Sequence, residues 1–309
     1  MRSNYLSIAL ILSSFGGISP IAAQTSQFPM SADVALTEVG GLDQVLDLGP
    51  RFVLFGELHG TNEAPRFFAD VVIALASQGK HVLVAVELSA PEDVAMQRAW
   101  AAAPEEFARA LTGPDWTLRR DGVTSGAMRD MLVRLQQYKA SGAAVSIVAF
   151  NGYRDDAQRL RLQSLGPAGG HEVAQAENIA DAARRADADI TLVLVGNAHA
   201  EKTPISRDGM SYDPMAMTLA KSGRLVSLNM LYAGGTAWNC QLKADLKFDP
   251  AVPITTAMLD CANHPVTGLQ GKDDAPYIAL GPVQGANFDG RYDGYFWLGA
   301  ISGSVPALP

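Results

Sequence analysis

The sequence predicts an α/β fold: a mainly parallel sheet covered by helices on both faces, with an irregular or β-rich, disulfide-containing C-terminal extension. Five short apolar runs alternate with longer segments of helical periodicity, and after residue 231 Gly, Pro and Asn become frequent. Strands buried on both faces have continuous apolar sequences, and their alternation with helices favours a parallel sheet. The five runs are residues 52–55, 81–86, 143–150, 189–195 and 224–230.

The segments between these runs are expected to cover the sheet as helices. In the first of them, Phe67, Val71 and Leu75 fall on one face, which is the pattern of a helix packed against a core. Residues 113–122 are expected to form a loop, and the polar stretch 154–165 has no clear period. The expected helices span residues 62–78, 91–102, 104–111, 125–140, 171–186 and 213–221.

Composition and charge favour a globular protein that does not bind nucleic acids or anionic membranes. The 309 residues are 48% hydrophobic and 18% charged, as in an ordinary globular chain. A net charge of −8 without a basic run disfavours binding to nucleic acids and to anionic membrane surfaces. We expect a signal peptide over residues 1–23, an α/β domain over 24–231, and a C-terminal extension over 232–309 packed on the same domain.

The first 23 residues have the order of a secretory signal peptide. Arg2 precedes an apolar run at residues 5–15, and Ala22 and Ala23 supply a small-residue cleavage site. The alternative is a membrane anchor, but the run is too short and interrupted to cross a bilayer comfortably. No later stretch is apolar enough to span a membrane, so we expect a periplasmic or secreted protein.

The only two cysteines, Cys240 and Cys261, lie in the C-terminal extension. In an exported protein they are expected to form one disulfide, worth roughly 3 kcal/mol for a loop of this length. The alternative is two free thiols. A cysteine metal site is not expected, because there is no C-x-x-C pair and no histidine at ligand spacing.

Polar residues able to bind a metal or move a proton follow every predicted strand. Because the carboxyl ends of parallel strands meet at one edge of the sheet, these side chains are expected to converge there. Two of the strand ends share a G-x-x-H pattern, in which the glycine allows a sharp turn off the sheet. The residues are Glu57 and His59, then Glu87, Asn151, Asn197 with His199, and Asn229.

Two imidazoles and two carboxylates at one edge suit two kinds of chemistry. His59, His199, Glu57 and Glu87 could ligate a divalent metal and lower the pKa of its bound water. Without a metal, one histidine could act as a base toward water while a glutamate orients it. Each residue also has a structural alternative, such as a turn histidine for His59 or a helix-start acceptor for Glu87.

Three short motifs resemble the superfamily that joins erythromycin esterases, ChaN-type haem-binding lipoproteins and the Tiki/TraB proteins. They are L-F-G-E-L-H-G-T-N-E at 54–63, V-A-V-E at 84–87 and V-G-N-A-H-A at 195–200. Residues 171–179 are similar to that group's R-D-x-x-M-A-x-N-I helix, with Glu172 at the acid position and His171 in place of the arginine. The resemblance covers residues 51–230 and leaves the extension uncovered.

The resemblance implies a site at the carboxyl edge of the sheet, with His59, Glu57, Glu87 and His199 as the working residues. We expect Glu172 to contact the substrate. Arg66, in the first turns of the helix after His59, is a second candidate substrate contact, although a solvated helix arginine is an equal alternative.

Two functions follow as hypotheses. The first is an exported hydrolase that uses this His/Glu cluster, with a divalent metal, against an ester, lactone or peptide bond. The second is a ChaN-like protein that binds haem or iron without catalysis, although the chain lacks the lipid-anchor cysteine of ChaN. A third, plainer alternative is an interaction protein whose site has decayed.

Overall fold

Seven strands form one central sheet in the order β10-β11-β7-β1-β4-β2-β3. All neighbouring pairs in this sheet are parallel except β10 with β11. The fold class predicted from the sequence is therefore confirmed. The five predicted strands are β1 (Phe52–Glu57), β2 (Val82–Ser89), β3 (Val145–Asn151), β4 (Ile190–Gly196) and β7 (Leu225–Leu231).

This computed structural model describes residues 38–207, 210–246, 255–269, 275–283, 286 and 288–308. The expected signal peptide, residues 1–23, lies outside the described residues. Residues 36–309 group into a single unit, which contains the central sheet. None of the helices in the described ranges is long and apolar enough to cross a membrane.

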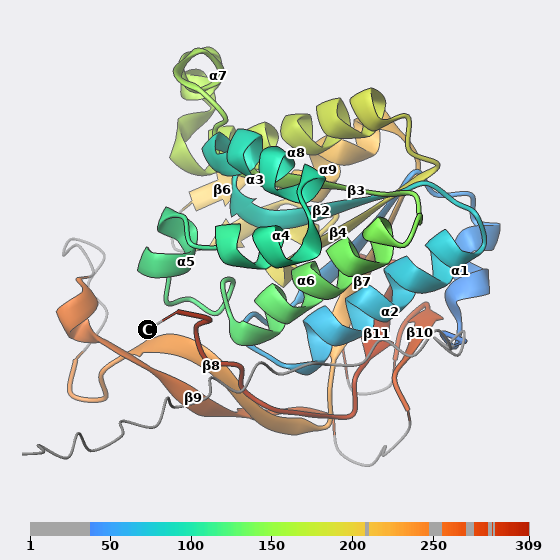
Figure 1. Cartoon of the computed structure of the whole chain (residues 1–309). Coiled ribbons are helices and arrows are strands. Elements are labelled where there is room, and N and C mark those ends of the chain that lie inside the picture. The colour runs from blue at the N-terminus through green and yellow to red at the C-terminus, as the bar shows by residue number, and fades with distance from the viewer. Residues whose placement is uncertain are drawn as a thin grey trace, which may run out of the picture. The chain divides into compact units, whose positions relative to one another are not determined.

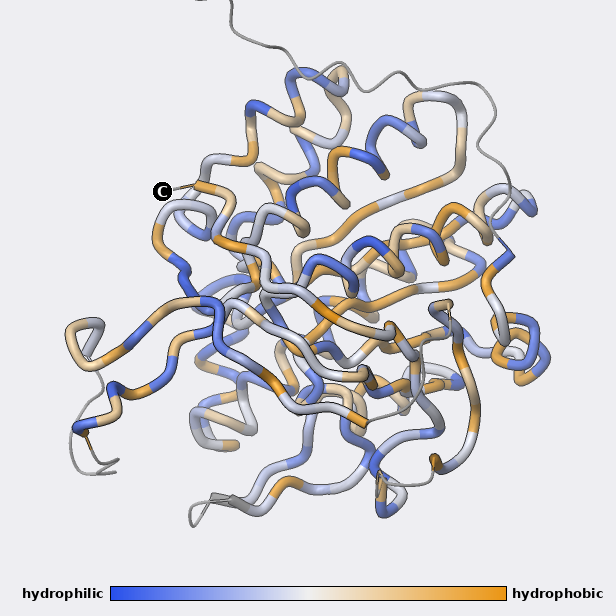
Figure 2. The backbone as a smooth tube through the Cα atoms, turned by 90° about the horizontal axis from the view of Figure 1, so that it is seen from below, coloured by the Kyte–Doolittle hydropathy of each residue, from blue (hydrophilic) through white to orange (hydrophobic). Residues whose placement is uncertain are grey.

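Helices cover both faces of the sheet (Figure 1). One apolar core packs the sheet against α2, α3, α4 and α6, and a second packs it against α8 and α9. In Figure 2 the tube alternates between hydrophilic and hydrophobic residues along the helices, as expected for helices with one buried face. Their bounds are α2 (Glu63–Ser77), α3 (Asp93–Ala101), α4 (Pro104–Ala110), α6 (Gly126–Ala140), α8 (Gly166–Ala186) and α9 (Met215–Leu219).

Three shorter helices fall where the sequence pattern is weaker. α1 (Leu42–Asp47) precedes the first strand, and α7 (Asp156–Leu162) lies in the polar stretch that has no clear period. α5 (Pro114–Leu118) occupies part of the segment expected to be a loop. Its five residues form little more than one turn, which is too short for a periodic pattern to develop.

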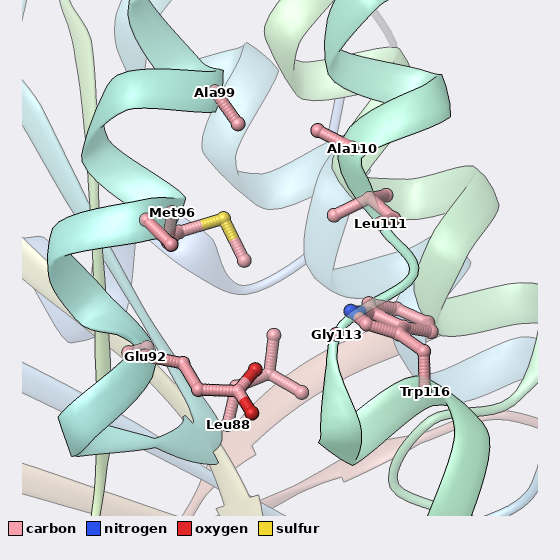
Figure 3. A pocket seen from close by; sticks show the side chains of 10 residues that line it. Leu88, Glu92, Met96, Ala99, Ala110, Leu111, Gly113 and Trp116 are labelled. Atoms are coloured by element: carbon pink, nitrogen blue, oxygen red, sulfur yellow. The ribbon is translucent and has the colours of Figure 1, made fainter.

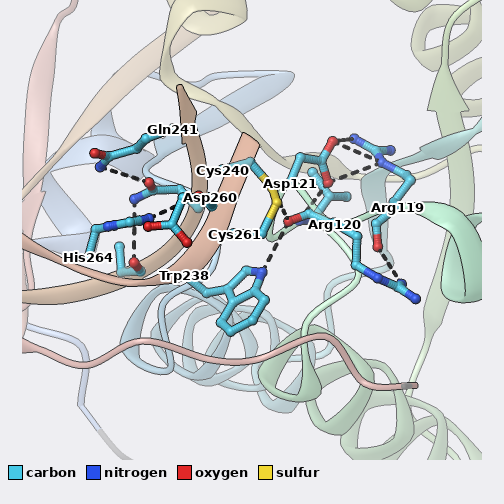
Figure 4. Close-up of a disulfide and its surroundings, with 12 residues drawn as sticks. Arg119, Arg120, Asp121, Trp238, Cys240, Gln241, Asp260, Cys261 and His264 are labelled. Carbon is cyan, nitrogen blue, oxygen red and sulfur yellow. Dashed lines mark hydrogen bonds and ion pairs between the residues drawn. A yellow bond between two sulfur atoms is a disulfide. The ribbon is translucent and has the colours of Figure 1, made fainter. Parts of the chain in front are cut away.

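The chain after residue 231 builds two structures. β8 (Gly234–Leu242) and β9 (Leu259–Thr267) form a long antiparallel hairpin, flanked by β12 (Ala300–Ile301). β10 (Tyr277–Leu280) and β11 (Gly294–Trp297) join the central sheet beside β7. The β-rich, disulfide-containing extension is confirmed: Cys240 and Cys261 face one another across the hairpin and are bonded (Figure 4).

A two-stranded sheet, β5 (Ile205–Arg207) with β6 (Met210–Tyr212), completes the described strands. The end of the chain returns to the first strand–helix turn. Asn62 directly precedes α2, and its side chain donates to Ser302 Oγ at 3.0 Å and to the Gly303 carbonyl at 3.1 Å. The last strand and the turn after β1 are thus held together.

Removing the disulfide is expected to destabilise the protein without unfolding the sheet. A Cys240→Ser, Cys261→Ser double variant releases a loop of 21 residues in the unfolded chain, which corresponds to about 3 kcal/mol. Urea unfolding followed by circular dichroism measures the change. Reduced wild type is the matched comparison, because it should lose the same free energy of unfolding. Equal midpoints for the oxidised, reduced and double-variant proteins would contradict a stabilising role for the disulfide.

Candidate functional site

Three buried carboxylates lie beneath two half-buried imidazoles at the carboxyl edge of the sheet. Glu57, Glu87 and Glu172 expose 5% of their surface or less. The side chains of His59 and His199 expose 21% and 24%. Sequence reasoning placed all five residues in one site, and direct side-chain contacts bring them together in the structure.

Strand order explains why these residues meet. β1, β4 and β2 are consecutive in the sheet, so the ends that carry Glu57, Gly196 and Glu87 are neighbours. A 3₁₀ turn at Asn197–Ala200 follows β4 directly and carries His199 over the edge. Gly196 itself must be small: a Cβ added there would lie 2.8 Å from His59 Nε2. The glycine therefore allows the His59 imidazole to reach Glu87.

His59 is held between two carboxylates. Its Nδ1 lies 2.9 Å from Glu57 Oε1, and its Nε2 lies 3.3 Å from Glu87 Oε2. Burial alone would lower the pKa of His59, but the negative charge of Glu87 and the hydrogen bonds to both glutamates outweigh it and raise the pKa to about 10. His59 is therefore an imidazolium at neutral pH, with a proton on each nitrogen.

Glu87 is the common partner of the site. Its Oε2 accepts the Gly196 backbone N–H at 2.8 Å, and its Oε1 lies 3.9 Å from His199 Nε2. Burial alone would raise the pKa of Glu87, but the nearby charge and hydrogen bond of His59 hold it well below its usual range. Glu57 differs, because burial outweighs its contact with His59 and raises its pKa. Glu57 Oε2 is buried with no hydrogen-bond partner among the described residues.

His199 is oriented by Glu172. Its Nδ1 lies 2.7 Å and 2.9 Å from the two carboxylate oxygens of Glu172, and Glu172 Oε2 also accepts the Met215 N–H at 2.8 Å. Burial would lower the pKa of His199, but the hydrogen bond to Glu172 and the charge of Glu87 raise it overall. Glu172 was expected to contact a substrate; in the structure both of its oxygens are already engaged.

Arg119 stands beside Glu87, at the end of α5. Its Nη1 donates to the Glu87 backbone carbonyl at 2.9 Å, and its Nη2 lies 4.0 Å from Glu87 Oε1. Asp121 holds the other edge of the guanidinium, with a shortest distance of 2.7 Å. Sequence reasoning placed Arg119 in a loop and did not count it among the site residues, because its link to Glu87 crosses 32 residues that no local motif marks.

A third imidazole, His171, lies near His199, with ring centroids 6.2 Å apart. Its Nε2 contacts the side chain of Gln175, which donates to Asn151 Oδ1 at 2.8 Å. Burial lowers the pKa of His171. The strand-end residue Asn151 thus supports this histidine.

Arg66 lies outside the His/Glu cluster. It is exposed on α2 and lines a cavity of about 380 Å³ together with Glu63, Phe67 and Asp70. None of the residues that line this cavity belongs to the His/Glu cluster. The structure therefore does not place Arg66 with the other predicted site residues.

Two further cavities border the carboxyl edge. One, of about 320 Å³, lies between the end of β7 and the β8–β9 hairpin and is lined by Leu58, Asn197 and Asn229. The other, of about 130 Å³, is mainly apolar and lies between α3 and α5, where Met96, Leu111 and Trp116 face one another and Glu92 stands at one side (Figure 3). The first contains two of the predicted strand-end asparagines.

The residues do not fit a divalent metal well. Among the described residues, no group of three or more His, Cys, Asp or Glu side chains is arranged to hold a metal ion. The donors pair with one another instead: His59 uses both nitrogens on Glu57 and Glu87, and Glu172 uses both oxygens on His199 and the Met215 N–H. In this arrangement the imidazoles and carboxylates are placed to hold and exchange protons with one another.

No protein-family model matches this chain, and no curated protein is similar to it at a significant level. Solved structures do match. A histidine-to-asparagine mutant of the erythromycin esterase EreC, in its open conformation, is 13% identical, covers 84% of this chain and 93% of its own, and superposes with a TM-score of 0.55. A succinoglycan biosynthesis protein gives 11% identity, 85% and 92% coverage, and a TM-score of 0.55.

The haem-binding ChaN of Campylobacter jejuni is 17% identical over 62% of this chain and 85% of its own. Its TM-score of 0.39 supports no further comparison. The resemblance suggested by the short motifs is confirmed by the first two structures as a shared fold. At these identities the likeness concerns the fold alone.

Removing each carboxylate is expected to affect the two histidines differently: Glu87 influences both pKa values, whereas Glu172 influences only that of His199. Glu87→Gln removes the charge that raises the pKa of His59, so that pKa should fall from about 10 toward or below its ordinary value. Glu172→Gln should lower the pKa of His199 and leave His59 unchanged. Nuclear magnetic resonance of the five histidines measures both. A fall of the His59 pKa in Glu172→Gln, or an unchanged His59 pKa in Glu87→Gln, would contradict this pairing.

The raised pKa of His59 also predicts a pH dependence of stability. The folded protein binds this proton more tightly than the unfolded chain does, so the contribution is complete below pH ~6.5. It is lost as the pH rises toward about 10. Urea unfolding between these pH values should therefore show a decline that is smaller in Glu87→Gln. An equal decline in the free energy of unfolding of wild type and Glu87→Gln would show that His59 is not the cause of the decline.

Proposed function

We propose that this protein is an exported hydrolase in which His199 activates water and His59 stabilises the negative charge that develops on the substrate. The observation that carries the proposal is that the two imidazoles have different carboxylate partners. One is hydrogen-bonded to a single carboxylate through Nδ1, and the other is held as a cation between two carboxylates. The substrate bond is an ester, a lactone or a peptide bond.

His199 has the geometry of a general base. A carboxylate only accepts hydrogen bonds, so Glu172 fixes the proton of the neutral ring on Nδ1 and leaves the lone pair on Nε2. That nitrogen lies 3.9 Å from Glu87 Oε1, beyond hydrogen-bond distance, and can accept a proton from water. This is the arrangement of a histidine base oriented by an acid.

His59 is suited to the opposite role. A ring that keeps both protons up to about pH 10 cannot accept one at neutral pH, but it carries a positive charge. Arg119 adds a second positive charge beside Glu87. Preorganised cations of this kind stabilise an oxyanion without reorganising during the reaction.

The reaction is balanced without further groups. His199 Nε2 takes a proton from water as the water oxygen bonds to the carbonyl carbon, and the carbonyl oxygen becomes an oxyanion beside the cations. When the tetrahedral intermediate collapses, the bond to the leaving group breaks, and His199 returns the proton to the leaving oxygen or nitrogen. The products are a carboxylic acid and an alcohol or amine.

Two observations support the proposed type of substrate bond and the proposed cellular compartment. The chain shares its fold with a solved erythromycin esterase, which supports hydrolysis of an ester or lactone bond. The bonded Cys240–Cys261 pair supports an oxidising compartment, and hence a periplasmic or secreted protein.

Turnover is expected to follow a bell-shaped pH profile. Activity should rise as His199 loses its proton, at a pH above the ordinary histidine value because its pKa is raised. It should fall again near pH 10, where His59 loses the charge that stabilises the oxyanion. Initial rates on ester, lactone and peptide panels measure the profile. A rate that keeps rising beyond pH 10 would show that hydroxide drives the reaction and would contradict a role for the His59 charge.

Loss of the base is expected to reduce kcat by about 10²- to 10⁴-fold in His199→Gln. Glu172→Gln should act through the same base and give a smaller loss. The matched control is His81→Gln, which changes another half-buried histidine, bonded to Ser146 at the opposite edge of the sheet. It should leave kcat unchanged.

The same assay separates the alternatives. Side-chain catalysis predicts that EDTA leaves turnover unchanged, whereas loss of turnover with recovery by a divalent ion would replace it with the metal-dependent hypothesis. Saturable haem absorption without turnover on any panel would replace hydrolysis with haem binding.

A further inference from the structure

One residue of the C-terminal hairpin contacts two loops that carry site side chains. His59 and Gly60 form the turn after β1, and residues 119–122 form the loop after α5. Trp238, on β8, hydrogen-bonds to both (Figure 4 shows the second contact). Neither loop is near Trp238 in sequence.

The first contact is made by the backbone. The Trp238 N–H donates to the Gly60 carbonyl at 2.9 Å, and the Ser304 N–H donates to the same oxygen at 2.8 Å. Gly60 has a positive φ of 74°, and a Cβ added there would lie 2.0 Å from the Trp238 carbonyl oxygen. The turn after His59 is therefore pressed directly against β8, where only glycine fits.

The second contact is made by the side chain. The Trp238 indole N–H donates to the Arg120 carbonyl at 3.0 Å, and Cys240 Sγ lies 3.2 Å from the same oxygen. Gly122 completes the junction: its φ is 93°, and an added Cβ would lie 2.7 Å from Gly60 N. The two loops and β8 thus meet backbone to backbone.

These contacts lead to the centre of the site. The residue before Gly60 is His59, which contacts Glu87 at 3.3 Å, and the residue before Arg120 is Arg119, which contacts the Glu87 carbonyl at 2.9 Å. Trp238 therefore contacts the residues that follow His59 and Arg119, and the side chains of both His59 and Arg119 contact Glu87.

We propose that Trp238 is a positioning residue for the active site, and that the disulfide-pinned C-terminal hairpin serves to hold the His59 and Arg119 loops together around Glu87. The effect on turnover rests on the proposed function, whereas the effect on the position of Arg119 does not.

The chain offers a matched control for the indole N–H. Trp297, on β11, is 2% exposed, and its Nε1 has no hydrogen-bond partner among the described residues. Trp297→Phe therefore removes a similar group without removing a hydrogen bond. Trp238→Phe keeps an aromatic ring on β8 and removes the indole N–H that donates to the Arg120 carbonyl.

A reporter of the Arg119 position lies on the far side of the site. The positive charge of Arg119 is one of the influences that lower the pKa of His171, after burial and the charge of His199. If Arg119 moves away from Glu87, the pKa of His171 should rise. Arg119→Gln, which removes the charge, gives the full size of that rise.

The experiment is a histidine titration by nuclear magnetic resonance, together with kcat and KM, for wild type, Trp238→Phe, Trp297→Phe and Arg119→Gln. We expect Trp238→Phe to raise the pKa of His171 in the same direction as Arg119→Gln, and to lower kcat roughly fivefold with little change in KM, as for a misplaced charge. Trp297→Phe should change neither.

The outcomes separate the two proposals. An unchanged His171 pKa in Trp238→Phe, where Arg119→Gln raises it, would overturn the positioning role. A raised His171 pKa in a protein without hydrolytic activity would support the positioning role and overturn the proposed function. If Trp238→Phe does not fold, as judged by circular dichroism, Trp238→Tyr is measured in its place, because it also lacks the indole N–H while keeping a polar ring.

Discussion

The site depends on keeping the Glu87 carboxylate charged where water hardly reaches it. A buried carboxylate is costly unless nearby donors and cations replace its hydration. The Gly196 N–H, the His59 imidazolium and the Arg119 guanidinium supply those partners from three separate segments. Each partner therefore has to be placed by the fold: His59 by the turn after β1, the Gly196 N–H by β4, and Arg119 by the loop after α5.

The strand-end residues could be predicted from the sequence, because apolar runs mark buried strands and parallel strands end at one edge. The order of the strands could not. Only the structure shows β1, β4 and β2 as neighbours, which is why Glu57, Glu87 and His199 share one cluster while Asn151 and Asn229 stand at its margins.

The partners that come from elsewhere leave no local signal. Glu172 lies within a helix and was expected to contact the substrate, whereas in the structure it contacts His199 across 27 residues. Arg119 lies at the end of a one-turn helix, and Trp238 lies on a hairpin beyond the region that resembles known families. A pattern in sequence records periodicity and spacing, whereas these contacts are set by how loops pack in three dimensions.

The two histidines differ because of the number of carboxylates that each one contacts. Both nitrogens of His59 contact glutamates, Nδ1 with Glu57 and Nε2 with Glu87. The imidazolium proton is therefore held tightly and exchanges poorly with a substrate. His199 uses one nitrogen, and the other stays open beside Glu87. A base must bind its proton weakly enough to give it back, and a charge stabiliser must not lose it. The single carboxylate of His199 meets the first requirement and the double contact of His59 meets the second, so the distribution of three glutamates over two imidazoles accounts for the two roles that we propose.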